Sequence, residues 1–438
     1  MTSRLSSQLC QRLRLSALLG LIAISCSPSG ESSFEAETSE MPVKLQLIER
    51  IDHLDTLARE PMVVRHGSGT LFVSGYPSQV TGTDWTAPPL LWRSDDDGDT
   101  WQRVNVGSSA DGAQGNSDVD LAVGPDGTVY FISMGFNRAT REGTQIAVGV
   151  SHDAGANWQW HRLSDSRFAD RPWISAAPHG IAHAIWNDDR GVAYSISRDS
   201  GRTWTEQPRI HDSGGSSHMA VGPGGEIAVR ISPIAASANK FDGDTDLIAI
   251  SRDNGDSWQK YAAPGKISWD AALSDPSATD PSAVPRWVEP LAWGPNRTLY
   301  HLWSEGDSVM LGWSRDFGQS WQQQIVSQDA GMAFFPIMVA GESGEIAATW
   351  FVITGDSLTC RLVLIRPGAG NDSEHEVFQA DPFTSLAWEE TTDNHAPTPA
   401  GEYFPVVFLP NNELGVVTTI QDIHNARWGF SWWRFRLQ

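Results

Sequence analysis

An eight-residue pattern recurs five times along this chain and limits the folds that the chain can adopt. It reads Ser-x-Asp-x-Gly-x-(Thr/Ser/Asn)-Trp, and its copies are SDDDGDTW (94–101), SHDAGANW (151–158), SRDSGRTW (197–204), SRDNGDSW (251–258) and SRDFGQSW (314–321). Successive copies begin 57, 46, 54 and 63 residues apart. Self-similarity at such a period is typical of a propeller or a solenoid and argues against a single compact core.

Each copy lies between two β-type runs, so we expect it to form a hairpin. Gly accepts a positive φ, and Asp bonds its own backbone, which together make a tight turn. The Trp then returns the chain to a strand and buries a large flat surface. A hairpin that recurs five times builds the fold, so we interpret its Asp residues as structural and not as catalytic.

A second repeat predicts the number of blades. Seven times the chain reads a short apolar strand, a turn rich in Gly, Pro and Asn, and another strand. We expect each unit to form the two inner strands of a four-stranded blade. These units begin at Pro61, Asp120, Pro172, His218, Pro290, Pro336 and Pro405. The sequence therefore predicts an all-β fold, a seven-bladed β-propeller over residues 44–438, with six blades as the alternative.

The repeated hairpin would supply the two outer strands of the first five blades. The sixth blade has the run 360–368 (CRLVLIRPG) in its place, and the seventh has 428–438 (WGFSWWRFRLQ). The early strand-like run 43–49 (VKLQLIE) is expected to complete the last blade and so close the ring.

The first 43 residues read as a targeting segment followed by a tether. Three Arg residues precede the apolar run 15–24, and small residues lead to Cys26. This pattern predicts a lipoprotein signal peptide over 1–25 and lipidation of Cys26, with an ordinary secretory signal or a short anchor as alternatives. Residues 26–43 are rich in Ser and Glu and are expected to be a disordered tether. Ser27 resembles a signal for the outer membrane, so we expect the bacterial cell envelope as the location.

The net charge and the few cysteines of the chain disfavour several classes of partner and bound group. After loss of the signal, 28 basic residues face 53 acidic ones. Nucleic acid and anionic membrane surfaces are poor partners for such a chain, so membrane contact would come only through the lipid. Cys360 alone remains outside the signal region, and we expect it to be buried and inert. His179 and His183 are too few for a zinc site. We expect a monomer without metal or cofactor.

The residues just before the seven inner strands are candidates for a binding pocket. Strand alternation lets one of each neighbouring pair face the central channel. Arg, Asp, Glu and Tyr at this place are unusual for simple core packing. Two positions before the starts lie Arg59, Asp118, Asp170, Ser216, Val288, Phe334 and Tyr403; one position before lie Glu60, Val119, Arg171, Ser217, Glu289, Phe335 and Phe404.

The recurring pattern resembles the Asp-box of the sialidase (neuraminidase) superfamily. In that family the box is structural and lies on the face away from the active site. The run 59–61 (Arg-Glu-Pro) resembles the family's Arg-Ile-Pro, which implies that Arg59 grips a substrate carboxylate. The resemblance further implies Tyr403 as nucleophile, Glu289 as its activating base and Asp84 as the acid/base.

The chain departs from the family in two respects. Sialidases usually have six blades, and two further Arg of their pocket have no counterpart in matching context here. Arg171 and Arg286 lie near the same rim and could rebuild a basic cluster, while His218 begins a blade and could contact substrate.

The resemblance implies an exo-α-sialidase-type, retaining glycoside hydrolase, and we expect an acidic carbohydrate as its partner. A carboxylate on the anomeric carbon would repel an anionic nucleophile but not a neutral Tyr. Two alternatives stay open. One is a polysaccharide lyase acting on uronic-acid glycans through a His or Tyr base. The other is a propeller lipoprotein that binds glycans or proteins without catalysis, because many functions share this fold.

Overall fold

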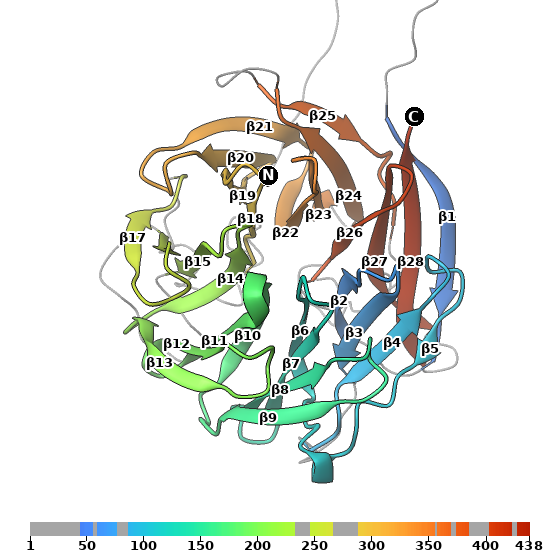
Figure 1. Ribbon diagram of the computed structural model, residues 1–438. Helices are drawn as coiled ribbons and strands as arrows, with labels where there is room; N and C mark the ends of the chain where they lie inside the picture. The colour runs from blue at the N-terminus through green and yellow to red at the C-terminus, as the bar shows by residue number, and fades with distance from the viewer. Residues whose placement is uncertain are drawn as a thin grey trace, which may run out of the picture. The chain divides into compact units, whose positions relative to one another are not determined.

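Seven four-stranded antiparallel sheets, arranged around a common centre, build the fold in the computed structural model (Figure 1). The structure describes residues 44–55, 59–76, 86–232, 246–265, 288–354, 357–368, 374–384, 403–422 and 427–438. Residues 43–438 form one unit, and only this unit is described below. The predicted all-β propeller with seven blades is confirmed, and the alternative of six blades is wrong.

The first three blades follow one another along the chain, each running from its inner to its outer strand. Blade 1 holds β2 (Arg59–Arg65), β3 (Leu71–Tyr76), β4 (Leu90–Ser94) and β5 (Gln102–Arg103). Blade 2 holds β6 (Ser117–Val123), β7 (Val129–Asn137), β8 (Glu142–Ser151) and β9 (Gln159–Ser164). Blade 3 holds β10 (Asp170–Ala177), β11 (Ile181–Asp188), β12 (Gly191–Ser197) and β13 (Thr205–His211).

The next three blades repeat this order. Blade 4 holds β14 (Gly215–Val221), β15 (Ile227–Ser232), β16 (Leu247–Ser251) and β17 (Gln259–Ala262). Blade 5 holds β18 (Leu291–Trp293), β19 (Leu299–Glu305), β20 (Ser308–Ser314) and β21 (Gln322–Gln328). Blade 6 holds β22 (Met332–Ala340), β23 (Ile346–Thr354), β24 (Ser357–Arg366) and β25 (Glu376–Gln379).

Blade 7 closes the ring with strands from both ends of the described chain. It holds β26 (Val406–Leu409), β27 (Glu413–Asp422), β28 (Arg427–Leu437) and, outermost, β1 (Leu45–His53). β1 pairs antiparallel with β28 along its whole length, from Leu45 opposite Leu437 to His53 opposite Phe430. The expected closing role of this early strand is confirmed. The described part of the chain holds only two short 3₁₀ turns besides strands, η1 (Ser109–Asp111) and η2 (Pro178–Gly180).

The recurring eight-residue box forms the same hydrogen-bonded turn in each of the first five blades. In the first copy, Gly98 N donates to Ser94 Oγ at 2.9 Å. Asp96 accepts from Thr100 twice, from the backbone N at 2.9 Å and from the hydroxyl at 2.6 Å. Asp97 and Gly98 both have a positive φ, of 55° and 96°. The Asp therefore satisfies a turn that would otherwise leave backbone donors exposed, and the structural interpretation of the boxes agrees with this geometry.

Each box turn also covers the blade before it. Its Gly lies directly against a large side chain of the preceding blade: Gly98 against Trp432, Gly155 against Phe72 and Gly255 against Tyr194. Because no room is left for a Cβ at these places, the glycines allow close packing between blades. Buried side chains of adjacent blades then form continuous clusters, such as that of blades 7 and 1 around Trp92 and Trp432.

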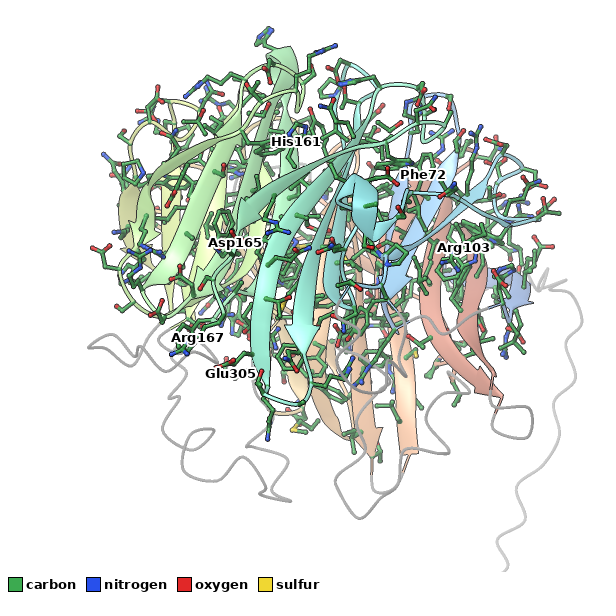
Figure 2. All side chains as sticks on the ribbon, turned by 90° about the horizontal axis from the view of Figure 1, so that it is seen from below. Phe72, Arg103, His161, Asp165, Arg167 and Glu305 are labelled. Carbon is green, nitrogen blue, oxygen red and sulfur yellow. The ribbon has the colours of Figure 1, made fainter. Side chains whose placement is uncertain are left out.

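The strand directions separate two faces of the ring. Arg59 at the start of β2 lies opposite Tyr76 at the end of β3, whereas Arg65 and Ser94 both lie next to Leu71 at the other end. We call the face of the five box turns the box face, and the face where the inner strands begin the mouth face. In the edge view of Figure 2, Phe72 lies toward the box face and Glu305, which ends β19, toward the mouth face.

We expect the substitution Gly98→Ala to destabilise the propeller by about 3 kcal/mol or more. The new Cβ would have to adopt a φ of 96° and would overlap the indole of Trp432. Gly67→Ala is the matched control, because it lies on the same face with nothing within 4 Å of its added Cβ. Denaturant unfolding measures both variants. Equal stability of the two would contradict the role of the box glycine in blade packing.

Candidate functional site

The inner strands of three blades begin with a strained backbone at the mouth face. Glu60, Arg171 and Phe335 have φ values of 50°, 48° and 50°, and a Pro follows each of them. The strand register shifts at the same three places, so each inner strand begins with a bulge. Left-handed non-Gly residues in strands cluster at functional sites, and a bulge re-aims the side chains around it. The residues predicted to line the pocket therefore occupy special backbone positions.

Arg59, Glu60 and Tyr76 form the first polar group of the mouth. Arg59 and Tyr76 are cross-strand neighbours of β2 and β3. Glu60 is 8% exposed and Tyr76 is 4% exposed. Burial, and then the negative charge of Glu60, raise the pKa of Tyr76 well above its usual value. The phenol shares a hydrogen bond with the Glu60 carboxylate, and Arg59 and Asp118 act on it electrostatically. A neutral phenol is thus held beside a carboxylate and a guanidinium.

Tyr76 was not predicted as a site residue. It ends the second strand of blade 1, whereas the predicted pocket residues lie just before the first strand of each blade. Its pairing with Arg59 follows from the hairpin register, because residues that start one strand of a hairpin lie opposite those that end the next. That register is the signal that could have found it.

Glu289 lies in a second, fully buried group. Its side chain is 1% exposed, and Arg230 Nη2 lies 2.9 Å from Glu289 Oε2. Arg230 also pairs with Asp246 and donates to Ser217 Oγ at 2.6 Å. His301 Nε2 lies 3.9 Å from the same Glu289 oxygen. A buried carboxylate needs such compensation.

Arg230 is a residue that the analysis of the sequence missed. It stands alone as a charge in the apolar strand β15 (IAVRIS), and it is fully buried. A single Arg on a buried strand that carries no other charge requires a buried anionic partner, and this is the signal that could have marked it.

Tyr403 and His218 meet around Trp173. The Trp173 ring centroid lies 5.5 Å from that of Tyr403 and 5.3 Å from that of His218. Leu291 N donates to His218 Nδ1 at 3.2 Å, and burial lowers the pKa of His218 to about 4. Since Nδ1 accepts this bond, the neutral ring carries its proton on Nε2. His218 can therefore donate a hydrogen bond from Nε2 at neutral pH.

Asp120 is a buried carboxyl one layer below the mouth. It lies on β6 and accepts hydrogen bonds from Leu121 N at 2.8 Å and, across the blade boundary, from Ile174 N at 2.9 Å. Burial raises the pKa of Asp120 to about 7, although both hydrogen bonds lower it. Asp120 thus ties blade 2 to blade 3, and a pKa of about 7 lets it change charge near neutral pH.

The remaining predicted residues divide into two sets. Arg171 lies at the mouth in the left-handed position of blade 3, and it is partly buried. Asp84, Arg286 and Cys26 lie outside the described residues, as do the signal peptide and the tether. Cys360 is buried on β24, as expected.

The described residues hold neither a metal-binding cluster nor a membrane-spanning helix. None of their His, Cys, Asp and Glu side chains gather in threes or more where a metal ion could be held. No helix among these residues has both the length and the apolar character needed to cross a membrane.

Comparison with known proteins identifies the fold alone. No family model and no curated protein matches the sequence. Among solved structures, a protein of unknown function from Dyadobacter fermentans is similar at 14% identity, covering 91% of this chain and 100% of its own, with a TM-score of 0.51. An α-L-arabinanase from Penicillium chrysogenum is similar at 13% identity, with 88% and 98% covered and a TM-score of 0.45. A sialidase from Trypanosoma rangeli is similar at 15% identity, with 73% and 59% covered and a TM-score of 0.43.

Asp120 predicts a pH dependence of stability. Its pKa is raised in the folded chain, so the folded state binds more protons than the unfolded state between about pH 4 and 7. Stability from this group therefore falls as pH rises through that window and is level above it. The free energy of unfolding of the native chain should therefore fall between pH 5 and pH 8. We expect this fall to be about 2–3 kcal/mol smaller in Asp120→Asn.

Denaturant unfolding at the two pH values measures this difference for the native chain and the variant. The two proteins are compared by the slope of their free energy of unfolding against pH. Asn has one acceptor oxygen where the carboxylate has two, and the stability lost with that acceptor is the same at both pH values. An unchanged slope in the Asn variant would mean that Asp120 is charged throughout.

Proposed function

We propose that this chain is a glycoside hydrolase that acts, at the mouth face, on a sugar bearing a carboxylate. The observation that carries the proposal is the Tyr76 phenol, hydrogen-bonded to the Glu60 carboxylate beside Arg59. A sugar with a carboxylate on its anomeric carbon requires a nucleophile without charge, and a phenol paired with a carboxylate base meets this need. A guanidinium close by can bind the substrate carboxylate through two parallel hydrogen bonds.

The proposed reaction has two displacements at the anomeric carbon. Tyr76 Oη attacks this carbon while its proton passes to Glu60, and the bond to the leaving sugar breaks as an acid protonates the leaving oxygen. The resemblance to sialidases assigns this acid to Asp84. Water, losing its proton to the same acid/base, then attacks the anomeric carbon, and the bond to Tyr76 breaks as Glu60 returns the proton. The sugar is released with retained configuration.

Tyr403 is the alternative nucleophile, as the resemblance implies. Its expected base, Glu289, has Arg230 at 2.9 Å, and a guanidinium so close makes a carboxylate a weaker proton acceptor. Tyr403 itself packs against Trp173. This arrangement favours Tyr403 and Trp173 as an apolar wall for the sugar ring, with His218 as a donor.

The geometry of His218 argues against this residue as the base of a polysaccharide lyase. A lyase base must accept a proton from a sugar carbon. In His218 the accepting nitrogen Nδ1 is already occupied by Leu291 N, and Nε2 carries the proton. His218 is therefore a donor in the proposed mechanism.

We expect the full chain to hydrolyse a fluorogenic α-sialoside and Tyr76→Phe to lower kcat at least about 100-fold, with KM little changed. Tyr403→Phe is the matched variant and should lower kcat less than about tenfold, because it keeps the ring. Steady-state fluorescence measures both. The reverse order of effects would assign the nucleophile to Tyr403. If the native chain does not hydrolyse the sialoside, the hydrolase proposal fails, and release of an unsaturated product from a uronic-acid polysaccharide would then favour the lyase alternative over the binding protein.

Arg59→Gln should raise KM for the same substrate at least about tenfold, because the substrate carboxylate loses its guanidinium partner. Arg167→Gln serves as the control, since Arg167 is exposed in the β9–β10 connection at the mouth face (Figure 2). Comparison of KM between the two variants separates a specific contact from the loss of one positive charge. A KM that rises equally in both would point to general electrostatic attraction alone.

A further inference from the structure

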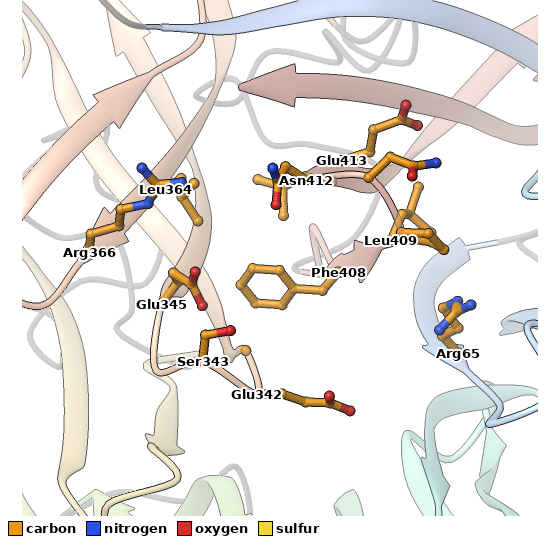
Figure 3. Close-up of a pocket in the computed structure, with 14 residues that line it drawn as sticks. Arg65, Glu342, Ser343, Glu345, Leu364, Arg366, Phe408, Leu409, Asn412 and Glu413 are labelled. Carbon is orange, nitrogen blue, oxygen red and sulfur yellow. The ribbon is translucent and has the colours of Figure 1, made fainter. Parts of the chain in front are cut away.

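A groove opens on the box face between blades 6 and 7, remote from the mouth (Figure 3). Its volume is about 450 Å³, within the range of pockets that hold small ligands. It lies between the turn that joins β22 to β23 and the turn that joins β26 to β27. Arg65, at the end of β2, borders it from blade 1.

The closure of the ring explains why this groove exists. In blades 1 to 5 a box turn joins the two outer strands and covers the blade before it. In blade 6, His375 takes this place, with its ring 4.4 Å from the Trp313 ring of blade 5. In blade 7 the two outer strands are β28 and β1, which meet at Leu437 and Leu45 without a turn between them. The corresponding surface of blade 6, around Leu364, therefore lines an open groove.

An aromatic ring stands in the middle of the groove. Figure 3 shows Phe408 pointing between the turn of blade 6 and Asn412 of blade 7. A Cβ on Gly341 would lie 3.0 Å from the Phe408 ring, so the glycine leaves room for the ring at this place. Gly341 N donates to Glu345 O at 2.7 Å, which fixes the turn on that side. The ring is thus presented by a defined backbone.

The charged side chains around the ring carry both signs, and one of them, Arg366, lies over the Phe378 ring at 5.1 Å. Arg65, Arg366, Glu342 and Glu345 line the groove, and within the described residues none of them makes a side-chain hydrogen bond or an ion pair. Glu413, by contrast, accepts from Arg436 Nε at 3.0 Å. The groove therefore offers donors that lack acceptors and acceptors that lack donors, set around one apolar surface.

This combination selects the chemistry of a ligand. A carboxylate or phosphate near Arg366 would also meet Glu345, and a cation near Glu345 would also meet Arg366 (Figure 3). A hydroxyl both donates and accepts, so it satisfies either neighbour without adding charge. The C–H face of a sugar ring is apolar and can lie on an aromatic ring. We propose that the groove between blades 6 and 7 is a binding site for an uncharged saccharide, separate from the mouth.

The proposal is tested by calorimetric titration of the full chain with cellobiose, maltose, lactose and arabinobiose. We expect at least one of these neutral disaccharides to bind with a Kd of about 1 mM or lower. Phe408→Leu should weaken binding at least about tenfold, because it keeps apolar volume but removes the flat ring. Arg366→Gln and Glu345→Gln should each weaken it as well, whereas Glu142→Gln, on β8 and remote from the groove, should not.

The outcomes separate this site from the proposed active site. Phe408→Leu should leave hydrolysis of the sialoside unchanged, and Tyr76→Phe should leave disaccharide affinity unchanged. Absence of binding by all four neutral disaccharides would overturn the proposal. So would binding that is indifferent to Phe408→Leu and Arg366→Gln, or tighter binding of glucuronate or glucosamine than of the neutral probes, which would indicate a site for charge.

Discussion

The box turn is the interaction on which the rest of this structure depends. Within a turn, Ser94 and Asp96 satisfy the backbone donors that the reversal exposes, and this lets two consecutive residues adopt a positive φ. Between blades, the same turn puts a glycine flat against the neighbouring core. The same eight residues therefore provide both the hydrogen bonds within the turn and the packing between neighbouring blades. All five box turns lie on one face of the ring. The strained inner strands begin on the opposite face, the mouth face.

The mouth shows how polar groups are tolerated next to a core. Three different solutions occur side by side: a phenol bonded to a carboxylate at Tyr76, a guanidinium shared between carboxylates at Arg230, and a protonatable carboxyl held by backbone donors at Asp120. Each leaves a different group at the mouth, respectively a neutral phenol, a fixed ion pair and a titrating acid. The three groups lie in different blades, which keeps these environments apart.

The sequence predicted the blades well because their signals are local. A turn motif, an apolar strand and its hairpin partner lie within about 15 residues of one another, and the period then orders the blades. The mouth could be predicted only in part. Arg59, Glu60 and Glu289 were placed correctly at the starts of inner strands, since that position follows from the repeat. Their partners Tyr76 and Arg230 were missed, because the pairing depends on hairpin register and on which carboxylate a buried cation reaches in space.

Closure of the ring by β1 sets the order of events during synthesis. Asp52 and Ser431, which share a 2.6 Å hydrogen bond across the closing strands, are 379 residues apart. β1 is therefore among the first described segments to leave the ribosome, and its pairing strand is the last. Until then its edge stays unpaired, with Leu47 and Ile48 among the few large apolar side chains that remain exposed even after folding. An unpaired strand edge can pair with other chains, so β1 is exposed to such pairing until β28 covers it.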